Sequence, residues 1–218
     1  MQHAGVPTPA FKTMDGSAWN DDGLRYPLIV KPVHESTSYG LEIVHNGKEL
    51  RSAVSAIVDM YRQPALVEEY IDGREVAIGL LGNEDVEALP TVELDFSGRA
   101  LKLMTWDDKY HKRLDEPTKI CPAPLPEKQN QELQRLAIAT FHACHLKDYA
   151  RVDIRIDLQG NPYVLEINSM ASLGDGGSYV KGATTAGYTM SGLVARIVEV
   201  AYCRYFGAGL VEQLHVAS

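Results

Sequence analysis

The chain has 218 residues, of which 45% are hydrophobic and 23% are charged. This balance is ordinary for a folded globular protein, and it excludes a disordered chain, a collagen-like repeat and a coiled coil. The 21 Lys and Arg against 29 Asp and Glu give a net charge of −8, which argues against general binding to nucleic acid or to an anionic membrane. A local basic pocket for phosphates is compatible with this charge.

The cysteines and the N-terminal residues indicate the cellular compartment in which the protein is expected. Cys121, Cys144 and Cys203 have no close spacing, so they predict neither a disulfide framework nor a zinc ribbon. No apolar stretch approaches the roughly 18 residues that span a bilayer, and residues 1–7 lack the charged and apolar regions of a signal peptide. We therefore expect a cytoplasmic protein with no membrane segment.

Glycine and proline punctuation divides the chain near residues 72–73, and we expect a smaller subdomain over 1–73 and a larger one over 74–218. In the first part, apolar runs and helical spacing predict two strands, a helix and a strand over residues 26–31, 41–45, 50–61 and 65–71. In the second part they predict strands over 75–81, 88–92 and 100–104, a helix over 133–144, a hairpin of 151–157 with 162–168, and a final helix over 193–201.

A long polar loop over residues 106–126 contains four prolines, and a loop of this length is typical of a lid or a binding loop. The C-terminal segment 193–206 either packs internally or covers a homodimer interface. Its apolar stripe favours internal packing.

The predicted hairpin carries the strongest chemical signal. Glu166 and Asn168 are two residues apart and share a side of their strand, and Asp153 can face the same way if the strands pair antiparallel. Three oxygen donors on adjacent strands suit a hard cation such as Mg²⁺, which completes its shell with substrate phosphates and water. The alternative is a solvent-facing row of polar residues.

Lys31 ends an apolar strand, where a buried ammonium requires an anionic partner such as a nucleotide phosphate. The alternative is a lysine that reaches solvent at the strand end. The loop 34–40 that follows offers three hydroxyls and several backbone N–H groups, which suit an anion cradle or an ordinary surface turn. The sequence contains no phosphate-binding P-loop and no strand-associated G-x-G-x-x-G motif.

Five motifs, taken in order, carry a resemblance to a known family. They are residues 29–40 (IVKPVHESTSYG), 67–75 (VEEYIDGRE), 109–110 (KY), 151–153 (RVD) and 165–168 (LEIN). In this order and spacing they resemble an ATP-grasp ligase, and within that class the D-alanine–D-alanine ligase family. The resemblance extends from residue 4 to the last helix.

The resemblance implies an α+β, ATP-grasp fold whose two subdomains grip ATP, and a ligase that forms a C–N bond between two amino acids as ATP becomes ADP and phosphate. The implied cofactors are ATP and two Mg²⁺ ions, a role that Mn²⁺ can also fill. The implied nucleotide-binding residues are Lys31 and Lys109 on phosphates, Ser36 and Ser38 in the loop over the γ-phosphate, Glu68 with the backbone of Glu69 and Ile71 on adenine, and Glu75 on ribose. The implied metal ligands are Asp153, Glu166 and Asn168, the implied catalytic residues are Arg151, Thr37 and Tyr110, and the implied binders of the second amino acid's carboxylate are Ser178 and Tyr179.

Two features depart from the family's pattern. Family members carry an N-terminal domain with an acidic residue for the first amino acid, and an ATP-binding lysine before the segment at residues 5–7; this sequence starts after both. We therefore expect a fragment or one half of a split protein that needs a missing N-terminal domain or a partner chain. After Asn168 the family has a Pro-Gly turn, whereas residues 168–178 read NSMASLGDGGS, which leaves the amino-acid or carboxylate substrates open.

Three functions are consistent with these patterns. The leading one is an ATP-dependent carboxylate–amine ligase. The alternative is a nucleotide-binding module that is inactive without a separate N-terminal domain or partner. An ATP-grasp kinase of a small molecule is less favoured, because the motifs follow the amide-forming branch.

Overall fold

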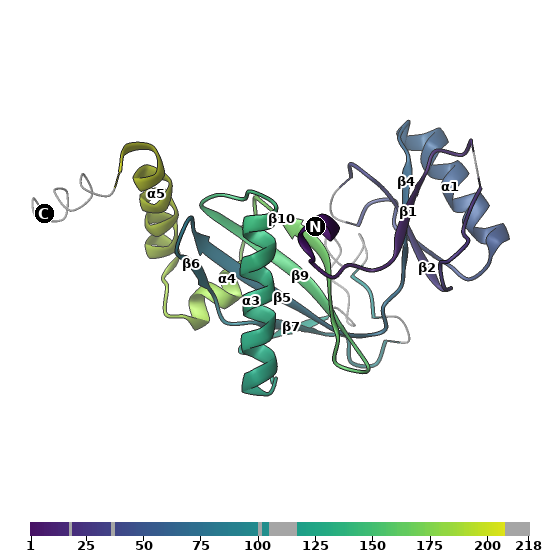
Figure 1. The fold of residues 1–218 in the computed structure, drawn as a ribbon. Helices are drawn as coiled ribbons and strands as arrows, with labels where there is room; N and C mark the ends of the chain where they lie inside the picture. The colour runs from purple at the N-terminus through teal and green to yellow at the C-terminus, as the bar shows by residue number, and fades with distance from the viewer. Residues whose placement is uncertain (18, 36–37, 100–101, 105–116, 208–218) are drawn as a thin grey trace, which may run out of the picture. The chain divides into compact units, whose positions relative to one another are not determined.

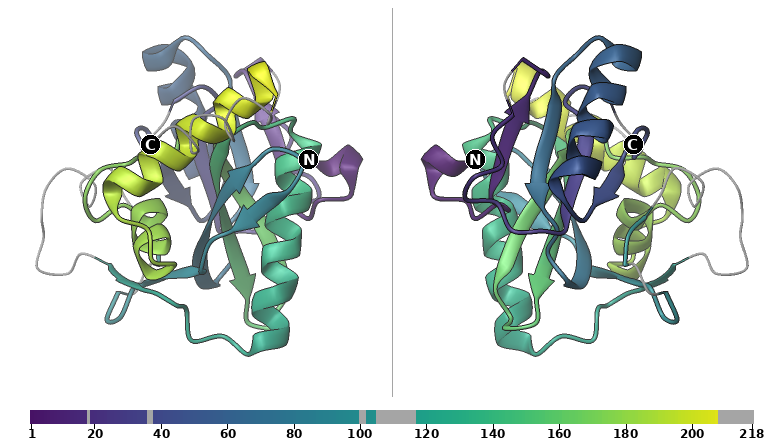
Figure 2. Two further views of the ribbon diagram at one scale, coloured as in Figure 1. Left: turned by 90° about the vertical axis from the view of Figure 1, so that its left-hand side faces the viewer. Right: turned by 90° about the vertical axis from the view of Figure 1, so that its right-hand side faces the viewer.

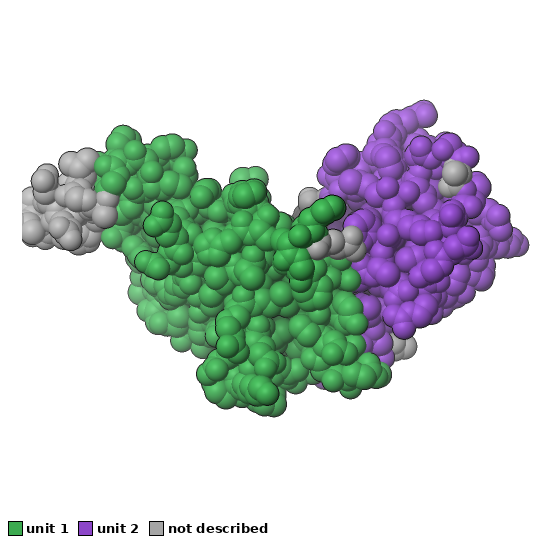
Figure 3. Space-filling model, viewed as in Figure 1, with its two compact units in different colours: residues 1–8, 74–95, 118–218 green, residues 9–73, 96–117 purple. Residues whose placement is uncertain are grey.

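The computed structural model describes residues 1–17, 19–35, 38–99, 102–104 and 117–207 (Figure 1). Contacts within the chain divide it into two units (Figure 3), which we name the large unit, of Met1–Thr8, Arg74–Asp95 and Thr118–Ser218, and the small unit, of Pro9–Gly73 and Phe96–Pro117. Compared with a simple division at residue 73, the first eight residues therefore join the large unit and Phe96–Pro117 joins the small unit. The assignment of 1–73 and 74–218 as subdomains stays a prediction.

The small unit contains a four-stranded antiparallel sheet in the order β1-β4-β2-β3. Its elements are β1 (Phe11–Met14), β2 (Leu28–Pro32), β3 (Glu42–Val44), α1 (Gly47–Tyr61) and β4 (Ala65–Glu69). α1 begins where the side chain of Asn46 accepts hydrogen bonds from the N–H groups of Lys48 and Glu49. The helix lies against the sheet (Figure 2). Its buried residues are Leu50, Ala53, Val54 and Ile57. The sequence patterns predict all of these elements except β1, which is short and buries only Met14.

The large unit contains a six-stranded sheet in the order β10-β9-β5-β7-β8, with β6 paired to β5. Its strands are β5 (Gly73–Gly82), β6 (Val86–Ala88), β7 (Val92–Asp95), β8 (Thr118–Ile120), β9 (Tyr149–Asp157) and β10 (Pro162–Asn168). Its helices are the 3-10 turn η1 (Gln2–Ala4), α3 (Glu127–Ala143), α4 (Ser178–Thr185) and α5 (Met190–Phe206).

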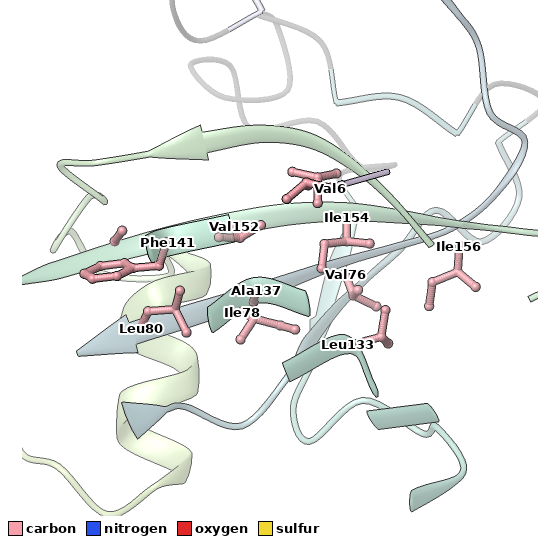
Figure 4. Close-up of a cluster of buried hydrophobic side chains, with 12 residues drawn as sticks. Val6, Val76, Ile78, Leu80, Leu133, Ala137, Phe141, Val152, Ile154 and Ile156 are labelled. Carbon is pink, nitrogen blue, oxygen red and sulfur yellow. The ribbon is translucent and has the colours of Figure 1, made fainter. Parts of the chain in front are cut away.

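One face of this sheet packs against α3 (Figure 4). The side chains that meet there are Leu133, Ala137 and Phe141 of α3, Val76, Ile78 and Leu80 of β5, and Val152, Ile154 and Ile156 of β9. Because successive residues of a strand face opposite sides, the other face of β9 carries Arg151, Asp153 and Arg155. The strand is therefore apolar on one side and charged on the other.

A second core joins the sheet to α4 and α5 and contains Leu81, Leu89, Ala171, Tyr179, Ala183, Leu193 and Val200. Gly79 makes this contact close, because a Cβ at its position would lie 2.8 Å from Leu89 and 2.9 Å from the Tyr179 ring.

Besides β1, the structure differs from the sequence-based elements in four places. The strand predicted over 88–92 is divided into β6 and β7, which flank Pro90. Residues 102–104 form no strand, and 100–101 lie outside the described residues. Of the predicted loop 106–126, Thr118–Ile120 forms β8, and residues up to 116 lie outside the described part. α4 was not predicted. None of the helices in the described part of the chain is long and apolar enough to cross a membrane.

Candidate functional site

A β-bulge in the β9–β10 hairpin places the acidic residues together. Val164 pairs with Ile154, but Glu166 pairs with Asp153, so Leu165 is an extra residue on β10. Val164 is fully buried in the core with Ile154. Without the bulge, Glu166 would share the core-facing side of Val164. The bulge turns Glu166 onto the charged face with Asp153.

Four side chains converge on this face. Arg151 donates from Nε and Nη2 to the two carboxylate oxygens of Asp153, at 2.6 and 2.7 Å. The Nδ2 of Asn168 donates to Oδ2 of Asp153 at 3.0 Å and to Oε1 of Glu166 at 3.1 Å. The Arg151 guanidinium lies 3.9 Å from Glu166. The structure therefore brings together the predicted metal ligands Asp153, Glu166 and Asn168 and the predicted catalytic Arg151.

The charges of this cluster are unequally exposed. The Asp153 side chain is 12% exposed, whereas that of Glu166 is 52% exposed. Burial raises the pKa of Asp153, and the guanidinium of Arg151 opposes this rise. Burial acts to lower the pKa of Arg151, but Asp153 and Glu166 outweigh it and raise that pKa above its ordinary value. Arg151 is therefore held as a cation between two carboxylates.

The donor set fits a hard divalent cation. Two carboxylates and one amide meet on two adjacent strands, and oxygen ligands of this kind are those that Mg²⁺ and Mn²⁺ take. Within the described ranges, no three His, Cys, Asp or Glu side chains group as metal ligands. The two carboxylates of this cluster therefore leave coordination positions to the amide of Asn168, to substrate oxygens and to water.

Glu75, predicted to bind ribose, pairs with Arg155 on the neighbouring strand. Arg155 Nη2 donates to Glu75 Oε2 at 2.6 Å, and the arginine side chain is only 2% exposed. Arg155 is not among the site residues predicted from the sequence. The alternation of Arg151, Asp153 and Arg155 opposite the apolar positions of β9 is the signal that could have found it.

In the small unit, Lys31 is paired rather than isolated. Its Nζ lies 2.7 Å from Oε1 of Glu68, and the two residues stand on the adjacent strands β2 and β4. The lysine side chain is 23% exposed. The structure thus brings together two residues that were predicted to contact different parts of a nucleotide.

Glu69, at the end of β4, is bound by Arg25. The guanidinium donates to both Glu69 carboxylate oxygens, at 2.7 to 3.2 Å, and the Arg25 backbone N–H adds a bond of 2.9 Å. These hydrogen bonds hold the pKa of Glu69 below its ordinary value. The backbone N–H of Glu69 donates to the Ala10 carbonyl, so a base contact at this residue must use its carbonyl. Ile71 follows the strand and is half-buried.

Ser178 and Tyr179 begin α4, and both are buried. The Tyr179 ring lies in the second core, and its hydroxyl donates to the Leu80 carbonyl at 3.3 Å. Burial raises the pKa of this phenol. The Tyr179 side chain is therefore a core group, and a substrate carboxylate can meet this residue only through the backbone. Before α4, Ala171 is anchored in the core while Met170 is 83% exposed.

Four predicted residues, Ser36, Thr37, Lys109 and Tyr110, lie outside the described residues. Ser38 is described and has a positive φ of 60°, and its carbonyl accepts a hydrogen bond from Leu41 at 3.3 Å. The part of the predicted site that depends on these four side chains stays a prediction.

The sequence matches the family described as the D-ala D-ala ligase C-terminus over residues 1–199. The chain belongs to this family. A relative from Sinorhizobium fredii, named uncharacterized protein y4sG, is 48% identical over 211 residues, which cover 97% of this chain and 62% of the relative. A D-alanine–D-alanine ligase from Pelotomaculum thermopropionicum is 31% identical over 212 residues, which cover 92% of this chain and 65% of that enzyme.

Solved structures of the family share the fold. A D-alanine–D-alanine ligase from Coxiella burnetii has a TM-score of 0.78 at 22% identity, over 99% of this chain and 58% of that one. A Bacillus anthracis D-alanine–D-alanine ligase complexed with ATP has a TM-score of 0.74 at 24% identity, over 91% of this chain and 62% of that one. The resemblance read from five motifs and the α+β, ATP-grasp fold are thus confirmed, and the chain spans less than two thirds of the length of these relatives.

Proposed function

We propose that the chain is an ATP-dependent carboxylate–amine ligase that joins two amino acids and that binds ATP and a divalent metal. The observation that carries the proposal is the convergence of Arg151, Asp153, Glu166 and Asn168 on one sheet face. Membership of the D-alanine–D-alanine ligase family supports it. Phosphoryl transfer to a carboxylate needs neutralised charge and in-line positioning more than a covalent nucleophile, and this cluster contains no nucleophile.

The proposed reaction has two steps. A carboxylate oxygen of the first substrate attacks the γ-phosphorus of ATP, so that ADP leaves and an acyl phosphate forms. The amine of the second substrate then attacks the acyl carbon, inorganic phosphate leaves, and the nitrogen loses a proton to give the amide. Arg151 donates hydrogen bonds toward the oxyanion that develops in either step, and its burial strengthens this stabilisation.

Asp153, Glu166 and Asn168 would hold the metal, which supplies charge neutralisation at the phosphates when it is bound. Lys31 leaves Glu68 for a phosphate oxygen, an exchange that a partly exposed ammonium can make. The backbone of Glu69 and Ile71 and the side chain of Glu68 contact adenine, and Glu75 contacts ribose. The assigned residues outside the described part keep their predicted roles: Lys109 and Ser36, together with Ser38, on phosphates, and Thr37 with Tyr110 at the first substrate. Ser178 and the Tyr179 backbone N–H bind the second carboxylate.

Turnover tests the metal assignment. Purified chain with Mg-ATP should release ADP only when an amino acid is added, and Glu166→Ala should abolish this release because it removes a metal ligand. Glu84→Ala, at an exposed position in the turn between β5 and β6, is the matched control and should keep wild-type turnover. Retained turnover in Glu166→Ala would overturn the metal assignment.

Nucleotide binding is measured separately. A non-hydrolysable ATP analogue with Mg²⁺ at about a hundred times Kd should stabilise the chain by roughly 2.7 kcal/mol. Lys31→Ala should remove most of this stabilisation. Lys102→Ala removes a lysine of the same unit that pairs with the exposed Asp72, and it should retain the full shift. Equal shifts in both variants would remove Lys31 from the nucleotide site.

A second candidate is a module that binds nucleotide and ligates only with a separately supplied domain or partner chain. The observation behind it is that the matched relatives extend well beyond this chain, which covers 62% and 65% of two of them. Amide product from the purified chain alone would exclude this candidate. A stable phosphorylated product in place of an amide would indicate a kinase.

A further inference from the structure

Arg155 is a buried cation near the end of β9 to which the proposed reaction assigns no role. Its side chain is 2% exposed, and its Nη2 contacts Glu75 at 2.6 Å. β5 and β9 are neighbours in the sheet and run antiparallel. Gly82, the last residue of β5, donates to the carbonyl of Asp148, just before the start of β9, whereas Glu75 and Arg155 lie near the opposite ends of the two strands. The two side chains therefore meet across adjacent, rigid strands.

A buried arginine is costly as a packing residue. Removing a guanidinium and a carboxylate from water carries a desolvation penalty that their attraction often fails to offset, so an apolar pair of similar volume usually stabilises a protein as well or better. On the opposite face of β9, the positions that pack in the core are occupied by valine and isoleucine. The contact that the structure shows for this charge is with the carboxylate of Glu75.

The other glutamates assigned to the nucleotide lack such a fixed partner. The cation on Glu68 is a lysine that is 23% exposed, and the cation on Glu69 is an arginine whose side chain is 83% exposed. Both cations are therefore more accessible to water than Arg155. Arg155 cannot leave Glu75 without leaving a charge buried, so the carboxylate of Glu75 keeps one orientation.

We propose that Arg155 is a positioning residue, which holds the Glu75 carboxylate oriented to accept hydrogen bonds from ribose hydroxyls and so sets a preference for ribonucleotides over deoxyribonucleotides. The inference rests on the proposed ATP-binding function. A carboxylate only accepts hydrogen bonds, and anchoring Oε2 fixes the direction of Oε1. A site built to bond a hydroxyl rejects the analogue that lacks it, because the buried acceptor is then left unmatched.

Calorimetric titration of the full chain with Mg-ATP and with Mg-2′-deoxy-ATP or Mg-3′-deoxy-ATP tests the proposal. The wild-type chain should bind ATP at least about tenfold more tightly than one deoxy form, as expected for a hydrogen bond to a charged group. Arg155→Met should reduce this ratio to about 1–3 while the deoxy-ATP affinity changes little. Arg155→Lys, which keeps the charge but not the planar fork, should give an intermediate ratio.

Two further variants separate positioning from stability. Arg74→Met removes the neighbouring Arg74–Glu93 pair of the same sheet, where the contacts are 2.7 Å, and should leave the ratio unchanged. Glu75→Gln should lower the ratio even if Arg155→Met does not fold, and adding Arg155→Met to it should lower the ratio no further.

The outcomes are distinct. Equal losses for ATP and deoxy-ATP in Arg155→Met would overturn the positioning role, and so would a wild-type ratio near one for both deoxy forms with ATP still bound. A wild-type chain that binds no adenine nucleotide would overturn the proposed function itself.

Discussion

Both units pair cations with buried carboxylates, but the pairs differ in how far the cation is removed from water. In the large unit, the side chains of Arg151 and Arg155 are 19% and 2% exposed. In the small unit, Lys31 is 23% exposed and Arg25 is 83% exposed. The carboxylates, by contrast, are well buried in both places, apart from Glu166.

The exposure of a cation decides how readily it can leave its carboxylate for a charged group of a ligand. An exposed cation is already solvated, so moving it from a carboxylate to a phosphate costs little. When a buried cation leaves a buried carboxylate, the carboxylate remains as an unpaired charge in the protein interior, which is costly. By this measure Arg25 of the small unit is the cation that a ligand can displace most easily, and Arg155 of the large unit is the one held most firmly.

The largest loss of stability is expected when one member of the most buried pair is removed. Arg155→Met should lower the free energy of unfolding by about 3–5 kcal/mol, because Glu75 is left as a buried charge without its guanidinium. Urea denaturation followed by circular dichroism measures this loss. The double variant Arg155→Met/Glu75→Leu removes both charges and should recover most of it; a double variant as unstable as the single one would contradict the account.

The sequence predicted most of this fold because its signals were local. Val54 and Ile57 at helical spacing located α1, and alternation in residues 151–157 located β9 with its apolar side toward α3. The failures have equally local causes. β1 has four residues and buries one of them, and Pro90 divides a run that otherwise reads as one strand.

The candidate site was only partly accessible to the same reasoning. Asp153, Glu166 and Asn168 were grouped correctly, but the grouping depends on the extra residue Leu165, which no pattern in the sequence indicated. A regular hairpin would have turned Glu166 to the core. Partnerships between distant residues were also missed, such as Lys31 with Glu68 and Glu75 with Arg155, because pairing across strands is set by register and not by composition.

A partly buried pair of the large unit should give an intermediate effect. Asp148, 17% exposed, accepts two hydrogen bonds from Arg204 of α5 at 2.7 and 2.9 Å, and one from Asn83 at 3.1 Å. Asp148→Asn should cost about 1–3 kcal/mol at pH 7. Asn tolerates the positive φ of 66° at this position, so the substitution isolates the charge.

The stability difference between the wild type and Asp148→Asn should depend on pH. In the wild type, the hydrogen bonds of Arg204 hold the pKa of Asp148 below its ordinary value of 3.8. The pair therefore stabilises the fold fully above pH 3.8, and its contribution falls as pH drops through the lower, folded-state pKa. Denaturation at pH 7 and at a series of lower pH values should show the wild-type and variant curves converging in acid. A difference that stays constant with pH would assign the effect to shape and not to charge.

The smallest effect is expected in the small unit, at the most exposed cation. Arg25→Ala should cost less than about 1 kcal/mol at pH 7, because the backbone N–H of residue 25 still donates to Glu69 and water can take the place of the exposed guanidinium. The pKa of Glu69 is lowered by the Arg25 hydrogen bonds, so this small contribution is present above the ordinary pKa of 4.5 and is lost as pH falls through the folded-state value. Urea denaturation in low salt and in 1 M NaCl measures it, and salt should reduce it further. A loss as large as that of Asp148→Asn would show that exposure does not decide the strength of these pairs. A small loss, combined with weaker ATP binding in Lys31→Ala, would locate the exchangeable charges in the small unit.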